Sequence, residues 1–153
     1  IRGNSDNTTG FRVINATAPL IIDGATITGG NAVGGNGGGI RSTSDLTLLN
    51  SIVSGNKSSN NGGGIQFRGA ELNVIDSVIA NNESGRKCGG IHQEIDGEVR
   101  IKNSTISGNI AINDGGGINN EEGTLFIFDS TISNNTGLKG GGIQNEMDGF
   151  VFL

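Results

Sequence analysis

Three glutamates in the C-terminal half of the chain occupy the same position in successive repeats. They are the first candidates for a binding or metal site. Glu94, Glu121 and Glu146 each follow by three positions the isoleucine of a Gly-Gly-Ile segment. If these segments stack as layers about 5 Å apart, the carboxylates repel one another unless a cation or a nearby Arg or Lys offsets their charge. Oxygen ligands of this kind suit Ca²⁺, which makes a calcium site one expectation. The loops that follow differ in length and favour the other expectation, a solvated acidic edge.

Three phenylalanines near the C-terminal end are candidates for ligand contact. Phe126, Phe128 and Phe152 occupy positions that we expect to point outward from their strands. Such rings either stack on a sugar ring or are covered by an adjoining domain, a loop or a neighbouring subunit. The second interpretation is favoured, because an exposed apolar patch commonly marks a contact surface.

The single histidine and the single cysteine do not form a recognisable catalytic pair. His92 follows Ile91 directly, so we expect it on the outer surface, and no Ser, Cys or Asp motif marks a partner for it. Cys88 replaces a glycine of a repeated motif, which indicates a tolerated small residue rather than a nucleophile. We therefore predict no catalytic residue in this segment.

The composition argues against several classes of partner. The 153 residues include 29 glycines, one proline and no tryptophan or tyrosine, and the formal net charge is −5. This mild acidity does not support binding to nucleic acid or to anionic membranes, which favour clustered Lys and Arg. No apolar run approaches the roughly 18 residues of a transmembrane helix, so we expect no membrane insertion by this segment.

A repeat of about 26 residues must position the candidate side chains. Its clearest mark is Gly-Gly-Gly-Ile, with cysteine for one glycine in the third copy, at 37–40, 62–65, 88–91, 115–118 and 140–143. A further apolar column recurs in steps of 26, 26, 26, 27 and 26 residues, at Ile1, Ile27, Val53, Ile79, Ile106 and Ile132. In the N-terminal third, we expect Val13 in the place of the motif isoleucine and Asn4 in that of a repeat asparagine. A period held this closely predicts stacked structural repeats.

Each repeat has the pattern of short strands. Apolar residues alternate with a period of two, as in Leu46-Thr47-Leu48, which is typical of half-buried strands and not of helices. Three such strands per repeat, separated by Gly, Asn and Ser turns, fit one rung of a parallel β-helix. We predict an all-β solenoid of about six rungs over 1–153, as one segment of a longer solenoid. The repeat asparagines are expected to stack as a ladder of side-chain amides, at Asn56, Asn82, Asn109 and Asn135.

The repeat unit LTLLNSIVSGNKSSNNGGGI, which recurs as VRIKNSTISGNIAINDGGGI, resembles known β-helix repeats. The similarity is to the right-handed parallel β-helix repeats of bacterial secreted and cell-surface proteins, within the pectate-lyase-like superfamily. The unit is also similar to the GGA[IL]/FxxN repeats of chlamydial polymorphic outer-membrane proteins, which are adhesins. The resemblance covers essentially the whole chain. It implies a right-handed coil and an extracellular or cell-surface location.

The superfamily contains both enzymes and non-enzymes, so the resemblance leaves two functions open. The first is a non-catalytic adhesin, passenger stalk or fibre element without a cofactor. Its partners would be carbohydrate, a host or cell-surface protein, or other copies stacked end to end, rung upon rung. The second is a segment of a polysaccharide lyase or glycoside hydrolase acting on acidic polysaccharide. Of the segments typical of polygalacturonases, N-T-D, D-D, G-H-G and R-I-K, only the last is present, at 100–102.

Overall fold

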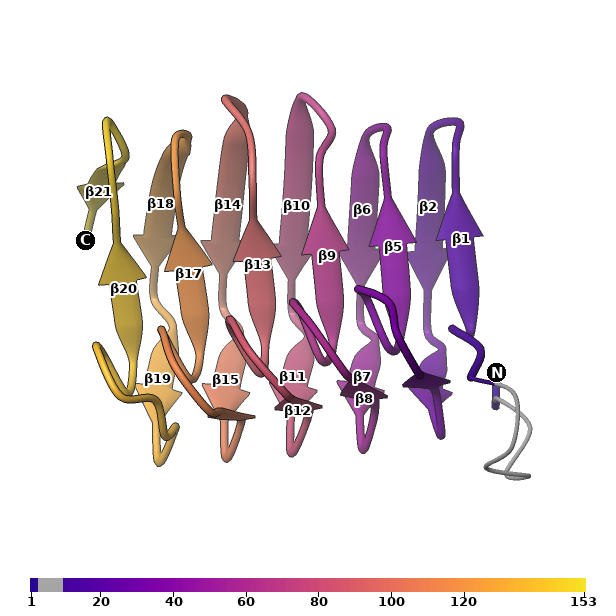
Figure 1. Ribbon diagram of the computed structural model, residues 1–153. Helices are drawn as coiled ribbons and strands as arrows, with labels where there is room; N and C mark the ends of the chain where they lie inside the picture. The colour runs from indigo at the N-terminus through magenta and orange to yellow at the C-terminus, as the bar shows by residue number, and fades with distance from the viewer. Residues whose placement is uncertain (3–9) are drawn as a thin grey trace.

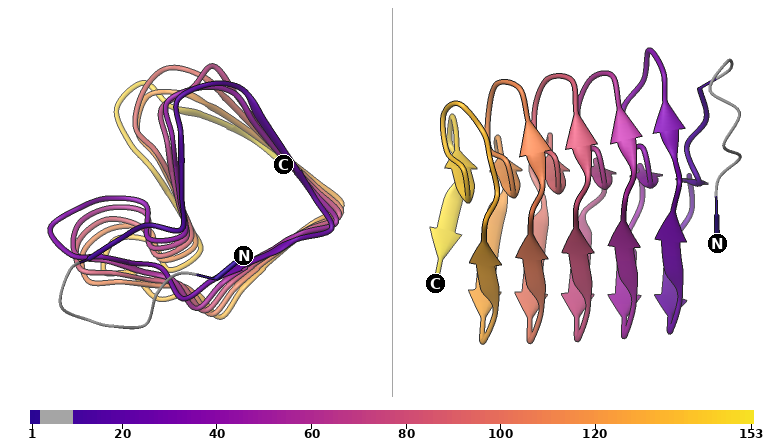
Figure 2. Two further views of the ribbon diagram at one scale, coloured as in Figure 1. Left: turned by 90° about the vertical axis from the view of Figure 1, so that its right-hand side faces the viewer. Right: turned by 90° about the horizontal axis from the view of Figure 1, so that it is seen from below.

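The chain coils into a right-handed parallel β-solenoid, which a computed structural model describes for residues 1–2 and 10–153 (Figures 1 and 2). The described residues form 21 strands and no helix. Every strand-to-strand pairing in the four sheets is parallel and joins one turn of the coil to the next. The predicted fold class is therefore confirmed. Asn4 lies outside the described residues.

Four sheets run along the solenoid axis. Sheet 1 contains β1 (Ile14–Ala16), β5 (Ile40–Ser42), β9 (Ile65–Phe67), β13 (Ile91–Gln93), β17 (Ile118–Asn120) and β20 (Ile143–Asn145). Sheet 2 contains β2 (Leu20–Asp23), β6 (Leu46–Leu49), β10 (Glu71–Ile75), β14 (Glu98–Lys102), β18 (Thr124–Phe128) and β21 (Phe150–Phe152). Sheet 3 contains β3 (Thr26–Thr28), β7 (Ile52–Ser54), β11 (Val78–Ala80), β15 (Thr105–Ser107) and β19 (Thr131–Ser133). Sheet 4 contains the short β4 (Asn31–Ala32), β8 (Lys57–Ser58), β12 (Glu83–Ser84) and β16 (Ile110–Ala111).

The number of strands per turn exceeds the prediction by one. Three were expected; of the additional two-residue strands of sheet 4, β8, β12 and β16 follow a repeat asparagine and β4 follows Gly30. Five turns contribute to sheets 1, 2 and 3, and a sixth adds only β20 and β21. Two-residue strands carry no alternating pattern of their own, so periodicity cannot reveal them.

The apolar columns face the interior between sheets 1, 2 and 3. In sheet 1 the motif isoleucines lie directly opposite one another and are fully buried in the central turns, at Ile40, Ile65, Ile91 and Ile118. Burial of each such side chain stabilises the fold by roughly 1.5–3 kcal/mol. The columns of sheets 2 and 3 complete one continuous core.

The first turn is displaced by one residue from the prediction. Ile14, and not Val13, pairs with Ile40. The reason is visible in the spacing to the next strand, because Ile14 precedes Leu20 by six residues, as Ile40 precedes Leu46. A strand shifted by one residue would turn its inward side chains outward.

The repeat asparagines form a hydrogen-bonded ladder at the bend between sheets 3 and 4. Asn82 Nδ2 donates to Asn109 Oδ1 at 3.0 Å, and Asn56 Nδ2 donates to Asn82 Oδ1 at 3.0 Å. The backbone N–H of each also donates to the amide oxygen of the next, as from Asn109 to Asn135 at 2.9 Å. A serine ladder lies beside it, where the N–H of Ser51 donates to Ser77 Oγ at 3.0 Å. These side chains satisfy buried backbone donors at a bend where no sheet can do so.

The cross-section has a re-entrant angle beside sheet 1 (Figure 2). The lateral loops, which lead from sheet 4 back to sheet 1, form a lobe on one side of that angle; they comprise 33–39, 59–64, 85–90 and 112–117. The turns that join sheet 1 to sheet 2 form its other side. On the outer face of sheet 1 the middle residues of β9, β13 and β17 are fully buried, namely Gln66, His92 and Asn119, whereas outward residues of sheet 2 such as Ile21 and Phe128 are exposed.

Candidate functional site

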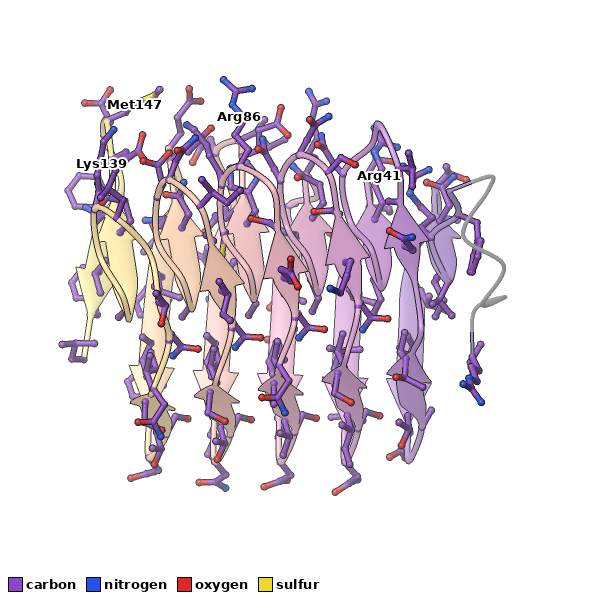
Figure 3. All side chains as sticks on the ribbon, turned by 60° about the horizontal axis from the view of Figure 1, so that its bottom comes forward. Arg41, Arg86, Lys139 and Met147 are labelled. Carbon is purple, nitrogen blue, oxygen red and sulfur yellow. The ribbon has the colours of Figure 1, made fainter. Side chains whose placement is uncertain are left out.

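Two groups of side chains outside the core carry chemistry. The polar cluster lies in the re-entrant angle on the outer face of sheet 1 and consists of Gln66, Lys87, His92, Glu94, Asp114, Asn119, Glu121 and Glu146. The aromatic face lies on the outer face of sheet 2 and consists of Phe126, Phe128, Phe150 and Phe152. Side chains crowd the edge of the coil that bears the lateral loops, where Arg41, Arg86 and Lys139 are labelled in Figure 3.

Register explains how the polar cluster is assembled. Gln66, His92 and Asn119 are the middle residues of three consecutive strands of sheet 1 and pair in one outward column. The three candidate glutamates begin the turns after β13, β17 and β20, so they form a second column beside the first. The lateral loops supply Lys87 and Asp114 from the opposite side.

His92 is fully buried, so the expectation of a surface histidine is wrong. Its side chain does point away from the core, but the cluster encloses it. Its Nδ1 lies 3.0 Å from Gln66 Oε1, and its Nε2 lies 3.1 Å from Glu121 Oε1. Strand alternation predicts which side of a sheet a residue faces, and it cannot show that a loop covers that side.

Lys87 lies between two of the candidate glutamates. Its Nζ contacts Glu121 Oε1 and lies 3.6 Å from Glu146 Oε2 and 3.8 Å from Asp114 Oδ2. Burial lowers the pKa of Lys87, but the hydrogen bond with Glu121 and the negative charges around it outweigh burial and raise that pKa overall. The ammonium group thus takes the position between the two carboxylates that a metal ion would need.

Glu94 is separated from this arrangement. Its carboxylate accepts a hydrogen bond from Gln66 Nε2 and lies 3.8 Å from Arg68 Nη1. Within residues 1–2 and 10–153, no group of three or more His, Cys, Asp or Glu side chains is arranged to hold a metal ion. The structure therefore brings the three glutamates into one column, as expected, but surrounds them with Lys and Arg, and it lends no support to a calcium site.

Several members of the polar cluster were not singled out from the sequence. Gln66, Lys87, Asp114 and Asn119 are buried or half-buried there. One signal was present, because the position after the motif isoleucine is polar in consecutive repeats, as at Gln66, His92 and Asn119. The participation of Lys87 and Asp114 had no sequence signal, since loop residues do not follow the strand alternation.

Cys88 has the properties of a structural residue. It is fully buried, adopts a φ of 54° in the place of a motif glycine, and its Sγ lies 2.8 Å from the carbonyl oxygen of Ile91. Burial raises the pKa of its thiol, which disfavours the reactive thiolate. This agrees with its interpretation as a tolerated small residue.

The aromatic face is built by register. Phe126 pairs with Arg100 of the preceding turn and with Phe152 of the following one, all on the outer side of sheet 2. The rings of Phe126 and Phe152 stack with centroids 5.0 Å apart and an angle of 14° between their planes. Phe128, on the same strand, lies 6.3 Å from Phe126 in a nearly parallel orientation. Phe128 and Phe152 are 48% and 51% exposed, so the outward orientation predicted for this group is correct.

The stacking determines which ring surfaces a ligand can reach. The guanidinium of Arg100 lies 5.4 Å from the centroid of Phe126, on the side away from Phe152. Both faces of the Phe126 ring are therefore covered, and only its edge is open to a partner. An open pocket of about 410 Å³ adjoins Phe128, and its lining includes Ile75 and Lys102. Lys102 makes no ion pair with a described residue, whereas Arg100 pairs with Glu71 and Glu98.

The charge of Glu121 makes the free energy of unfolding depend on pH. Burial would raise the pKa of Glu121, but hydrogen bonds from His92 and Lys87 and their positive charge lower it to about 2. A folded-state pKa below the unfolded value stabilises the protein above about pH 4.5, and this stabilisation is lost as the pH falls towards 2. We expect Glu121→Gln to lower the free energy of unfolding by at most about 3 kcal/mol at pH 6.

Denaturant titrations between pH 6 and pH 2.5 test this expectation. The difference between the two proteins should shrink as the pH falls, because protonation neutralises Glu121 in the natural chain as well. Glu83→Gln is the matched control, since Glu83 is exposed and, among the described residues, its one ion pair is with exposed Lys57, at 2.6 Å. This substitution should change the free energy of unfolding by no more than about 0.5 kcal/mol at every pH. If the free energies of unfolding of Glu121→Gln and the natural chain differ by the same amount at every pH in this range, the lowered pKa of Glu121 is contradicted.

Comparison of the chain with protein-family models, curated proteins and solved structures found no match. No helix among the described residues is long and apolar enough to cross a membrane. Because one fold serves many functions, the two side-chain groups carry the functional evidence.

Proposed function

We propose that this chain is part of a non-catalytic, secreted or cell-surface β-solenoid that serves as an adhesin, passenger stalk or fibre element. The resemblance of its repeat to bacterial right-handed β-helix repeats, including those of chlamydial adhesins, supports this class. The side-chain ladders support it as well, because they join successive turns and give a stiff, extended scaffold. A scaffold of this kind positions a contact face at a fixed place along a rod.

The exposed aromatic face is the observation that carries the proposal. Phe128, Phe150 and Phe152 lie together on the open side of sheet 2, and each is about half exposed or more. A contiguous apolar patch of this kind marks a contact surface on a soluble protein. The surface is rigid, because its rings are stacked on neighbouring turns of the coil.

The geometry favours a cell-surface protein over a carbohydrate as the partner. A sugar stacks on an open ring face, and both faces of Phe126 are covered. The exposed rings of Phe128, Phe150 and Phe152 instead offer a contiguous apolar surface that apolar side chains of a protein can cover. Lys102, at the rim, would meet a carboxylate of that partner.

Binding of the labelled protein to fixed epithelial cells tests the proposal. The double substitution Phe128→Ala/Phe152→Ala should reduce binding by about tenfold or more, since central aromatic residues dominate such interfaces. Ile110→Ala is the matched control, because Ile110 is also 48% exposed but lies in sheet 4. Protease treatment of the cells should abolish binding, whereas removal of surface glycans should not.

Two results would overturn the proposal. Equal binding by the double variant and the control would show that the aromatic face is not the contact surface. Release of unsaturated or reducing sugars from a panel of acidic polysaccharides, with or without Ca²⁺, would show that the segment belongs to an enzyme.

A further inference from the structure

Two half-buried arginines in the first two turns of the coil have no counter-ion among the described residues. The cations that make no ion pair with another described residue are Arg2, Arg12, Arg41, Arg86 and Lys102. Arg2, Arg86 and Lys102 are exposed, whereas Arg12 and Arg41 are half-buried. A half-buried cation loses part of its hydration and needs an opposite charge or hydrogen-bond acceptors instead. These two arginines are therefore candidates for an anion site.

Arg41 points into the re-entrant angle beside sheet 1. It is the middle residue of β5 and pairs with Asn15 on β1 and with Gln66 on β9, so its side chain belongs to the outward column of that sheet. Figure 3 shows it on the edge of the coil that bears the lateral loops. No described residue accepts a hydrogen bond from its guanidinium group. Its N–H donors are thus available to a ligand.

Arg12 is fixed against the lateral loop on the other side of the angle. Its Nε and Nη2 donate to the backbone carbonyl of Asn36, at 3.3 and 3.1 Å. A Cβ atom on Gly35 would lie 3.2 Å from Arg12 Nη2, so the guanidinium group packs closely on loop 33–39. Its Nη1 makes no hydrogen bond with a described residue. The side chain is therefore held in place and still has donors to offer.

The two guanidinium groups lie close enough to affect each other. Burial lowers the pKa of Arg12, and the positive charge of Arg41 lowers it further. Both side chains nevertheless keep their charge, because arginine is not deprotonated in proteins. Two neighbouring cations of this kind repel each other, and an anion bound by both would offset that repulsion.

A compact oxyanion fits this arrangement better than a carboxylate does. The planar guanidinium fork matches two oxygens of a phosphate or sulfate group. A tetrahedral oxyanion then has further oxygens for a second guanidinium group, whereas a carboxylate has two oxygens in all. Asn15, the neighbour of Arg41 in the outward column, is exposed, so a ligand can reach the site from solvent.

We propose that Arg12 and Arg41 form a binding site for a phosphate or sulfate group, either as the free ion or as a monoester. Arg41 donates to the anion through its free guanidinium group, and Arg12 donates through Nη1 while Nε and Nη2 stay on Asn36. The bound anion would join sheet 1 to the lateral loop 33–39 through Arg12. The site lies on sheet 1, away from the aromatic face on sheet 2, so it is independent of the proposed protein contact.

Isothermal titration calorimetry with inorganic phosphate tests the site, with the ionic strength kept constant by sodium chloride. The natural chain should bind with a Kd of about 1 mM, the affinity that a few charge-assisted contacts give at a partly exposed site. Arg41→Gln should weaken binding by about tenfold or more. This variant should fold, because Gln66 and Gln144 occupy the same outward column in other turns. Arg86→Gln is the matched control, since it removes an exposed, unpaired arginine from a lateral loop and should leave binding unchanged (Figure 3).

Titrations with other anions identify the ligand. Sulfate should bind as phosphate does, and acetate should bind about tenfold more weakly, because a carboxylate cannot serve both guanidinium groups. Glucose 6-phosphate separates the two sources: binding as tight as that of phosphate indicates a monoester, and binding of phosphate alone indicates the free ion.

Three results would overturn the proposal. They are no binding by the natural chain at about 10 mM phosphate, equal binding of acetate and phosphate, and equal binding by Arg41→Gln and Arg86→Gln. Circular dichroism checks that the variants are folded. If Arg41→Gln does not fold, the titrations of the natural chain with phosphate and acetate decide.

Discussion

Replacement of Asn82 by alanine is expected to lower the free energy of unfolding by about 3–5 kcal/mol. Asn82 lies in the middle of the asparagine ladder and is fully buried. Its Oδ1 accepts from the backbone N–H of Asn56 at 3.1 Å and from Asn56 Nδ2 at 3.0 Å. Its Nδ2 donates to the carbonyl of Val53 at 2.9 Å and to Asn109 Oδ1 at 3.0 Å.

The size of this effect follows from what alanine leaves behind. Groups on three neighbouring residues, Val53, Asn56 and Asn109, lose a hydrogen-bond partner, and all three residues are fully buried. A buried donor or acceptor without a partner costs about 1–3 kcal/mol, and partial relaxation of the bend reduces the sum. Isosteric leucine would not restore these bonds and should be at least as destabilising.

Denaturant unfolding monitored by circular dichroism measures the effect, with Asn113→Ala as the matched control. Asn113 is exposed in a lateral loop, and its side chain makes no hydrogen bond with another residue in 1–2 or 10–153. Its replacement should change the free energy of unfolding by less than about 0.5 kcal/mol. Similar losses for the two variants would show that the ladder contributes no more than an ordinary surface amide.

Replacement of Gly90 by alanine should destabilise the solenoid by at least about 3 kcal/mol or prevent folding. Gly90 is the last glycine of the third repeat motif, and the backbone of the next turn lies directly beside it. A Cβ atom there would lie 2.2 Å from the carbonyl oxygen of Gly117 in the next turn. This contact is with backbone, so relief requires the two turns to separate and their hydrogen bonds to lengthen.

Gly142→Ala is the control at the equivalent position of the last motif copy. A Cβ atom on Gly142 would have no neighbour closer than Ile132 Cγ2, at 3.5 Å. We expect this substitution to change the free energy of unfolding by no more than about 1 kcal/mol in the same denaturant assay. Equal losses at the two glycines would contradict the steric explanation, unless light scattering showed that another copy stacks on this end and supplies the missing carbonyl.

Much of the architecture could be predicted from the sequence because a solenoid repeats its own geometry. Once Ile65 and Ile91 are recognised as equivalent, parallel stacking places them opposite each other, and every residue between them is aligned as well. Inward isoleucines, the asparagine ladder and the outward phenylalanines follow from that single alignment. The prediction for Val13 was wrong by one residue because no Gly-Gly-Gly-Ile motif marks the register of the first turn.

The polar cluster depended on the tertiary structure. Lys87 meets Glu121 and Glu146 because a lateral loop folds back over sheet 1, and this contact does not follow the repeat period. His92 is buried as well, in contact with Gln66 and Glu121, although strand alternation alone places it on the surface. Likewise, alternation places Phe126 outward, but only the packing of neighbouring turns shows that Arg100 and Phe152 cover both faces of its ring.

The sequence by itself determined which residues lie in each column, because period and alternation are local properties of the chain. Only the tertiary structure decided which columns are covered and which charges meet, because those depend on how loops of unequal length pack across the outside of the coil.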